Sequence, residues 1–164
     1  MMIIQSKRVW IASQFISAQL EIYDGKILAV YPYQTKKVDI DVENDRIIPG
    51  FIDVHVHGAY GFDTNDAYPE GLIQVLRGIP SEGITSFLPT TVTQSEEVLT
   101  KALKNVAKVA KLRPEGAEIL GVHFEGPYLN VAYKGAQPEE HIVKPDIEQF
   151  KRYQQAAEGL IKLI

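Results

Sequence analysis

Cysteine is absent from the 164 residues of this chain. Its absence excludes a disulfide framework and a thiolate metal site, so any bound metal ion must use histidine and carboxylate ligands. Basic runs are lacking too, with 17 Lys and Arg against 21 Asp and Glu and a net charge of -4. A chain without a basic stripe does not suit a phosphate backbone, and we therefore expect no nucleic-acid partner.

Long hydrophobic runs are also missing. The apolar start, residues 1–10, has neither the extended hydrophobic core nor the small-residue cleavage pattern of a signal peptide. No later run approaches the length of a membrane span. With 45% hydrophobic and 23% charged residues, the composition is typical of a folded globular protein. We expect a soluble, cytoplasmic protein that binds no membrane.

Short β-type runs fill residues 1–48. They cover residues 3–10, 15–23 and 26–31, and the Asp24-Gly25 pair between the last two favours a hairpin turn. A segment of roughly 48 residues is near the lower limit for an independent hydrophobic core. This β-rich segment therefore needs a partner.

After Pro49-Gly50, strand-like and helix-like runs alternate. Strands are expected over residues 51–57, 84–92 and 118–125, and a last apolar run covers 160–164. Helices are expected over 69–83 and 145–158, and another begins after the capping residue Ser95. Alternation of this kind implies an α/β fold with parallel strands, either a doubly wound sheet or a (β/α)8 barrel. Four strands cannot close such a barrel, so we expect residues 49–164 to be the first half of a barrel that is truncated.

His55 and His57 are the first candidate metal ligands. They lie two residues apart on a predicted strand, so their side chains share a face and can converge on one ion. They also lie at the carboxyl end of that strand, where α/β barrels build their active sites. The alternative is that both histidines make local hydrogen bonds at a strand end.

Glu125 is the third candidate ligand. On the third expected strand it shares a face with Gly121 and His123 and lies at the strand's end, from which its carboxylate could reach the same ion. The alternative is a salt bridge to an Arg or Lys. His123, one pleat deeper, and Asp53, one pleat below His55, are candidates for orienting the ligands or for structural roles.

Several segments resemble a known family. Residues 48–58 (IPGFIDVHVHG) resemble the first barrel strand of the amidohydrolase superfamily. Four further segments resemble the N-acetylglucosamine-6-phosphate deacetylase family: GAYGFDTNDA (58–67), TSFLPTT (85–91), GVHFEGPY (121–128) and KGAQ (134–137). This resemblance implies a small β-sandwich, built from both ends of the chain, beside a (β/α)8 barrel. Residues 1–48 would then be the amino-terminal part of the sandwich.

The resemblance also implies roles for individual residues. Glu125 matches the family's carboxylate metal ligand, and His55 and His57 match a histidine pair found in members that hold two ions, so one or two divalent ions, zinc or iron, are expected. Ala136 and Gln137 match substrate-contacting positions, although family members often carry His where Gln137 stands. The catalytic Asp and the remaining ligands are expected beyond Ile164, and the spacing of His141 indicates only a surface or substrate-loop role.

The activity implied by the resemblance is hydrolysis of N-acetylglucosamine 6-phosphate to glucosamine 6-phosphate and acetate by an intact, homodimeric enzyme. The chain alone is expected to be inactive, because the general acid-base Asp is not among its assigned residues. Two alternatives stay open. One is another amidohydrolase, a cyclic amidase or a dipeptidase, which commonly uses a carboxylated lysine as bridging ligand; the other is a non-catalytic, truncated module.

Overall fold

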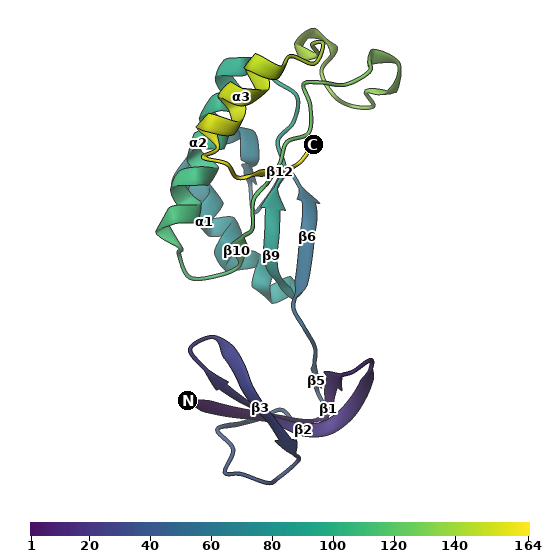
Figure 1. Ribbon diagram of the computed structural model, residues 1–164, viewed down its shortest axis with the longest axis vertical. Coiled ribbons are helices and arrows are strands. Elements are labelled where there is room, and N and C mark those ends of the chain that lie inside the picture. Colours follow the sequence, from purple (N-terminus) through teal and green to yellow (C-terminus); the bar gives the residue numbers. More distant parts are fainter. The chain divides into compact units, whose positions relative to one another are not determined.

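A computed structural model describes all residues from Met1 to Ile164. The chain divides into two compact units, Met1–Pro49 and Gly50–Ile164 (Figure 1). The predicted boundary, between residues 48 and 49, lies beside this division. Each unit has its own cluster of buried apolar side chains.

The first unit is a single sheet. Its strands are β1 (Met2–Ile11), β2 (Gln14–Tyr23), β3 (Lys26–Pro32), β4 (Ile40–Asp41) and β5 (Arg46–Ile47), in the order β3-β2-β1-β4, with β5 also paired to β1. The first three strands are antiparallel, whereas β4 and β5 run parallel to β1. The predicted hairpin is confirmed: Asp24 and Gly25 join β2 to β3 with positive φ angles of 49° and 69°, as a type I′ turn requires.

Few side chains are buried in this first unit. Val9, Ala18 and Leu20 form its buried cluster, with four partly buried neighbours, Ile4, Ile11, Ile22 and Ile47. Strand β3 meanwhile exposes Ile27 and Leu28, at 60% and 58% of their surface. A cluster this small contributes little hydrophobic stabilisation, in keeping with the short length of the segment.

The second unit alternates parallel strands with helices. Its main elements are β6 (Phe51–Val56), α1 (Pro69–Gly78), β9 (Ile84–Pro89), α2 (Glu96–Leu112), β10 (Glu118–Ile119), β11 (Val122–His123), α3 (Ile147–Ala156) and β12 (Ile161–Leu163). Strands β6, β9 and β10 form one parallel sheet, β11 and β12 form another parallel pair, and a bridge from Thr90 to His123 connects them. The strands thus follow one another in chain order, and the α-helices lie on one side of them (Figure 1). The α/β class expected from the sequence is confirmed.

A short hairpin follows β6. Strands β7 (Gly58–Ala59) and β8 (Phe62–Asp63) pair antiparallel, and a 3-10 helix (Thr64–Asp66) comes directly after them. Asp63 caps that helix by accepting the N–H of Asn65, while the Asp66 side chain accepts the N–H of Asp63. This reciprocal capping fixes the conformation of the first loop at the carboxyl edge of the sheet.

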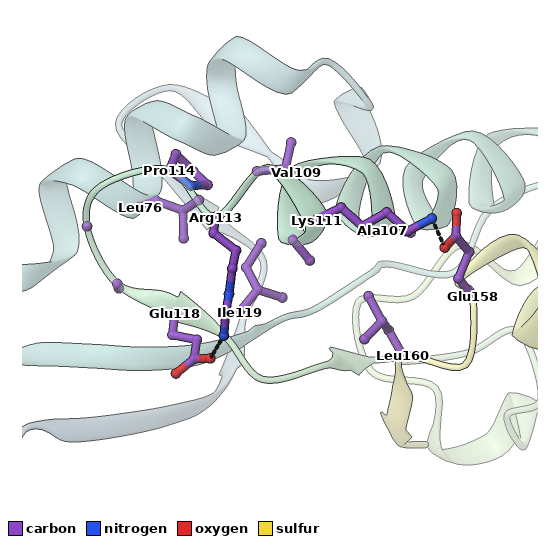
Figure 2. A pocket seen from close by; sticks show the side chains of 13 residues that line it. Leu76, Ala107, Val109, Lys111, Arg113, Pro114, Glu118, Ile119, Glu158 and Leu160 are labelled. Carbon is purple, nitrogen blue, oxygen red and sulfur yellow. Dashed lines mark ion pairs between the residues drawn. The ribbon is translucent and has the colours of Figure 1, made fainter. Parts of the chain in front are cut away.

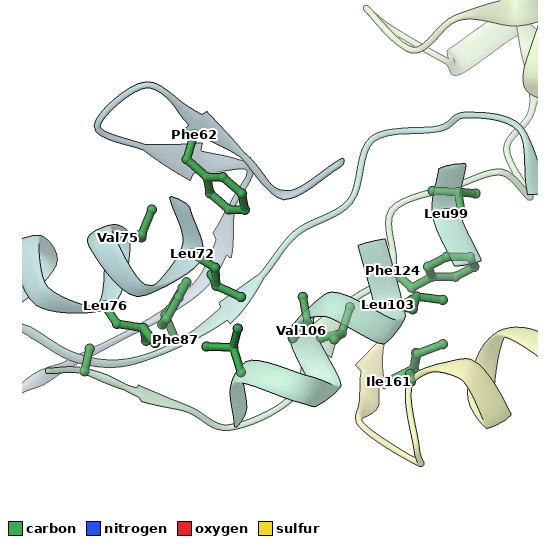
Figure 3. Close-up of a cluster of buried hydrophobic side chains, with 14 of the residues drawn as sticks. Phe62, Leu72, Val75, Leu76, Phe87, Leu99, Leu103, Val106, Phe124 and Ile161 are labelled. Atoms are coloured by element: carbon green, nitrogen blue, oxygen red, sulfur yellow. The ribbon is translucent and has the colours of Figure 1, made fainter. Parts of the chain in front are cut away.

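Helix α2 supplies much of the core of the second unit. Ser95 caps it as predicted, accepting the N–H of Val98, and Leu99, Leu103 and Val106 are fully buried. These side chains pack into one cluster with residues of α1, β9 and β12 (Figure 3). Burying each such leucine contributes roughly 1.5–3 kcal/mol. None of the helices combines the length and hydrophobicity needed to cross a bilayer.

Several expected elements are shorter than the sequence suggested; the strand expected over 84–92, for example, ends at Pro89. The strand expected over 118–125 is split into β10 and β11 and ends at His123, so Glu125 lies beyond it. The split covers Leu120 and Gly121, and a Cβ on Gly121 would lie 2.8 Å from the carbonyl oxygen of Leu160, just before β12. The helix expected over 69–83 ends at Gly78 and continues as a 3-10 helix (Ile79–Glu82), because Pro80 has no N–H to extend the α-helix.

Candidate metal centre

Three side chains converge at the carboxyl edge of the strands. The Nε2 atoms of His55 and His57 are 3.3 Å apart, and the Oε2 atom of Glu125 lies 3.1 Å from the first and 3.2 Å from the second. His55 belongs to β6, His57 follows it, and Glu125 follows β11. The structure therefore brings together the three residues that the sequence marked as metal ligands.

Local hydrogen bonds hold the two histidines in place. The N–H of His55 donates to Oδ1 of Asp53, at 3.0 Å. The carbonyl oxygen of His57 accepts both the N–H and the hydroxyl of Thr64, at 2.7 and 2.8 Å. Asp53 thus bonds the backbone of one candidate ligand, and Thr64 anchors the backbone of the other.

The three candidate ligands are open to solvent. Their side chains are 52%, 37% and 26% exposed, in the order His55, His57 and Glu125. The Nδ1 atom of His57 is buried and has no hydrogen-bond partner in the chain, so no protein group fixes its tautomer. A small molecule can approach the donor atoms from the exposed side.

His123 lies next to this group without joining it. Its ring is 8% exposed and meets the His55 ring edge-on, with centroids 4.7 Å apart, while its Nδ1 lies 3.4 Å from the Thr90 hydroxyl. Burial lowers the pKa of His123, and positive charge on His55 would lower it further. His123 therefore packs against His55 in surroundings that disfavour its charged form.

The donor set matches what a divalent transition metal needs. Ligands held 2.0–2.2 Å from a tetrahedral zinc ion lie about 3.3 Å from one another. The three observed separations are 3.1, 3.2 and 3.3 Å. Two imidazole nitrogens and a carboxylate oxygen are also donors that zinc and iron accept. The residues present therefore fit a metal ion of this kind.

The positions matched to substrate contacts lie in the long loop after Glu125. Ala136 is exposed, whereas Gln137 is buried at 8% exposure and its Oε1 accepts the N–H of Thr93, at 2.8 Å. The two N–H groups of the Gln137 amide and the second lone pair of its Oε1 are left for another partner. His141 is half-buried at the end of a 3-10 helix (Glu139–His141) and is not part of the converging group.

A separate cavity of about 440 Å³ lies away from the metal donors. Residues from the end of α2 and the start of β10 line it (Figure 2). The cavity therefore lies near the amino ends of the strands, opposite the edge that carries the donors. Arg113 and Glu118 pair across it at 3.5 Å, and Lys111 pairs with Glu158. It contains no histidine, which separates it from the candidate centre.

Comparison with known proteins places the chain in a family. The model of the amidohydrolase family matches residues 46–163. The chain belongs to the amidohydrolase family. The family is metal-dependent, and the group formed by His55, His57 and Glu125 is one that could hold an ion. The resemblance noted in the sequence is confirmed.

Amidohydrolases that act on amino-sugar phosphates are among its relatives. N-acetylglucosamine-6-phosphate deacetylase of Bacillus subtilis (strain 168) is 44% identical over 151 residues, which cover 87% of this chain and 38% of the relative. N-acetylgalactosamine-6-phosphate deacetylase of Escherichia coli O157:H7 is 34% identical over 146 residues, covering 89% and 38%. The crystal structure of N-acetylglucosamine-6-phosphate deacetylase from Thermotoga maritima aligns with a TM-score of 0.76 and 31% identity, covering 92% and 39%. The chain thus spans less than two fifths of the length of these relatives, as those shares show.

Sequence reasoning missed the residues that support the ligands. Thr64 and Asn65 lie in the resembling stretch 58–67, and Thr90 and Thr91 end the stretch 85–91, whereas Val92 and Thr93 lie outside it; none was given a role. Short polar side chains in loops have no periodic pattern, so nothing marks them as buried or bonded. One signal was present: Asp63 followed by Asp66 is close to a capping-box pattern and indicates an ordered loop.

Proposed function

We propose that the protein is a metal-dependent deacetylase that hydrolyses N-acetylglucosamine 6-phosphate to glucosamine 6-phosphate and acetate. The observation that carries the proposal is the convergence of His55, His57 and Glu125 in a chain similar to deacetylases of that substrate. The ion is zinc or iron, as one or two ions, because imidazole and carboxylate donors suit both metals.

In this scheme the chain's own residues bind the metal ion and orient its ligands. His55 and His57 offer neutral imidazole nitrogens, and Glu125 adds a negative charge that attracts a cation. Asp53 holds the backbone of His55, and the buried His123 supports its ring. When bound, the ion supplies Lewis acidity, polarising an amide carbonyl and making water acidic enough to yield a nucleophile near neutral pH. The general acid-base Asp is not assigned among these residues.

The domain organisation belongs to the same proposal. Residues 49–164 are the first half of a (β/α)8 barrel, and residues 1–48 are part of a small β-sandwich. Support comes from the strands, which follow in chain order without the reversal of a doubly wound sheet, and from helices that cover one side of them. The homodimer stays a prediction from the resemblance, and the cytoplasmic location stays a prediction from the sequence.

The substrate's contacts are proposed for the loop after Glu125. Ala136 is exposed there, and the Gln137 amide keeps N–H groups that can donate to a sugar hydroxyl or phosphate oxygen. Its Oε1 already accepts the N–H of Thr93, so the N–H groups are the part of the amide that we propose contacts substrate. A histidine at this position would offer a different hydrogen-bonding pattern.

One alternative substrate has specific support. The similarity to an N-acetylgalactosamine-6-phosphate deacetylase makes the galacto epimer the second candidate. The acetamide is the same in both sugars, so the metal donors do not discriminate between them, and the hydroxyl contacts must. The cyclic amidase and dipeptidase readings are less favoured, because the converging group holds a glutamate and no lysine.

Assays of acetate release from the two sugar phosphates and of ring opening of dihydroorotate test the proposed function. The full-length protein, reconstituted with zinc or with iron, is given N-acetylglucosamine 6-phosphate, its galacto epimer and dihydroorotate. We expect N-acetylglucosamine 6-phosphate to be hydrolysed most efficiently and dihydroorotate not at all. Turnover of dihydroorotate, or equal turnover with the metal stripped by a chelator, contradicts the proposal.

A further inference from the structure

The three metal donors come from two strands that are not neighbours. His55 and His57 belong to β6 and the residue after its end, and Glu125 follows β11; strand β9 lies between them and contributes no donor. The distance between the histidine pair and the glutamate therefore depends on the chain that leaves β9. That chain is residues 90–93, here called the spacer segment.

The spacer segment is bonded to both strands that carry donors. Thr90 N–H donates to the carbonyl of Val56, and Thr90 Oγ1 accepts the N–H of Val56, at 2.9 and 3.0 Å. Val56 lies between the two histidines. On the other side, Thr91 N–H donates to the carbonyl of His123 at 3.1 Å, two residues before Glu125. One short segment thus contacts the backbone beside each set of donors.

Two amide side chains hold the spacer segment from outside. Asn65 forms a pair of hydrogen bonds with Val92: its Nδ2 donates to the carbonyl at 2.8 Å, and its Oδ1 accepts the N–H at 3.2 Å. Gln137 Oε1 accepts the N–H of Thr93 at 2.8 Å. These bonds tie the spacer segment to the loop before it and to the loop after it.

One further residue on each side links these side-chain hydrogen bonds to the metal donors. Thr64, next to Asn65, anchors the carbonyl of His57. Thr93 lies against Gly126, next to Glu125, so closely that a Cβ on Gly126 would fall 1.8 Å from the Thr93 hydroxyl. Thr90, Thr91 and Thr93 are at most 1% exposed, so the spacer segment has little room to shift.

We propose that Asn65 and Gln137 are positioning residues, which set the separation of the histidine pair from Glu125 by fixing the spacer segment. Neither side chain is among the converging donors. The inference rests on the proposed metal site, because it assigns these amides a role in holding that site's geometry. Loss of either clamp lets the donors separate, which weakens metal binding and changes the ligand field.

A matched control exists in the same unit. Gln154 makes the same two-bond amide clamp on Ile161, with its Nε2 donating to the carbonyl at 3.3 Å and its Oε1 accepting the N–H at 3.1 Å. Gln154 and Asn65 are both half-buried. Gln154→Leu therefore removes an equivalent clamp without touching the spacer segment.

The test is titration with Co²⁺ alone, followed by visible absorption, for the wild-type chain, Asn65→Leu, Gln137→Met and Gln154→Leu. We expect Asn65→Leu and Gln137→Met to bind Co²⁺ about 10-fold or more weakly, with shifted absorption bands. Gln154→Leu should keep the wild-type spectrum and affinity, although its melting temperature falls. Asn65→Asp, which keeps the acceptor for Val92, should recover part of the affinity.

The outcomes separate the two proposals. Wild-type affinity and bands in both folded clamp variants overturn the positioning role and leave the metal site intact. A wild-type chain that binds no Co²⁺ overturns the metal site, and the positioning role with it. If Asn65→Leu does not fold by circular dichroism, Gln137→Met decides the matter from the other side of the spacer segment.

Discussion

At the scale of single residues, the glycine after the second histidine shapes the candidate centre. Gly58 has a φ of 148°, and a Cβ there would lie 2.0 Å from the carbonyl oxygen of Phe62. Only glycine permits both that backbone angle and that close approach. The turn lets the chain fold back into the β7 and β8 hairpin and brings Thr64 to the carbonyl of His57.

Replacing Gly58 by alanine should destabilise the protein strongly. We expect Gly58→Ala to lower the free energy of unfolding by about 3 kcal/mol or more, because strain in φ adds to a backbone clash. Gly61→Ala is the control: Gly61 also has a positive φ, of 80°, but nothing lies within 4 Å of its Cβ position. That change should cost about 1–2 kcal/mol. Urea titrations followed by circular dichroism measure the free energy of unfolding of both variants. An equal loss of stability in the two variants contradicts the clash at Gly58.

The donor residues were predictable from the sequence, but their supports were not. Side chains two apart on a strand share a face, so His55 and His57 could be paired before any coordinates; the position of Glu125 at the end of the third expected strand, and then the resemblance, pointed to it. Asn65 could not be predicted as a support, because its two bonds to Val92 join residues 27 positions apart. Gln137 was expected to meet substrate, and the structure adds a buried bond to Thr93.

At the scale of elements, helices α2 and α3 are joined by one glutamate. Glu96 accepts hydrogen bonds from Arg152 at 2.8 and 3.2 Å and from Gln149 at 2.9 Å. The Arg152 bond first, and then the Gln149 bond, lower the pKa of Glu96 below its ordinary value of 4.5. Glu96 also lies in the first turn of α2, where a negative charge is favourable.

This lowered pKa predicts how stability depends on pH. Because the folded pKa is depressed, the contribution of Glu96 is fully present above pH 4.5 and is lost as pH falls through the folded pKa. Glu96→Gln should therefore be less stable than wild type at pH 7, and the difference should shrink as the pH falls below 4.5. Urea unfolding at several pH values measures this difference.

Glu97→Gln is the control for this measurement. Glu97 pairs with Lys101 within α2 only, and both side chains are highly exposed. Its removal should change the free energy of unfolding much less than that of Glu96, because solvent screens an exposed ion pair. A difference for Glu96→Gln that stays constant from pH 7 to pH 3 contradicts the assigned ion pair.

Elements differ in how well the sequence predicts them. Helix α2 was expected accurately, because a capping serine and an apolar face at helical spacing both mark it. The third strand was expected as one run and is split at Gly121. At the split the pairing partner changes from β9 to β12, which pairs Val122 with Ile161, 39 positions away, a contact that local patterns do not encode.

At the scale of the whole molecule, the two units carry different spectroscopic reporters. Trp10, the only tryptophan, belongs to the first unit, whereas all three α-helices belong to the second. The candidate metal ligands also lie in the second unit. The change at Pro49-Gly50 from β-type runs to alternating strand-like and helix-like runs made a division at this point predictable. The size of each hydrophobic core could not be predicted from the pattern.

Metal binding should therefore stabilise one unit selectively. With free zinc at about 100 times its dissociation constant, we expect the helical melt at 222 nm to rise by about 10 °C. The melt followed by Trp10 fluorescence should stay unchanged, because each unit has its own buried cluster. Calcium, which needs more oxygen ligands, should shift neither signal. Equal shifts of both signals with zinc contradict separate stabilisation.

The central claim is that His55, His57 and Glu125 together hold one divalent ion, and a zinc titration against a chromophoric chelator tests it most directly. Glu125→Gln keeps the size of the side chain but removes its charge. Glu118→Gln makes the same change at the first residue of β10, away from the candidate ligands. We predict that Glu125→Gln weakens zinc binding by about 100-fold or more, and that Glu118→Gln binds as the wild type does. Wild-type affinity in Glu125→Gln would contradict the account.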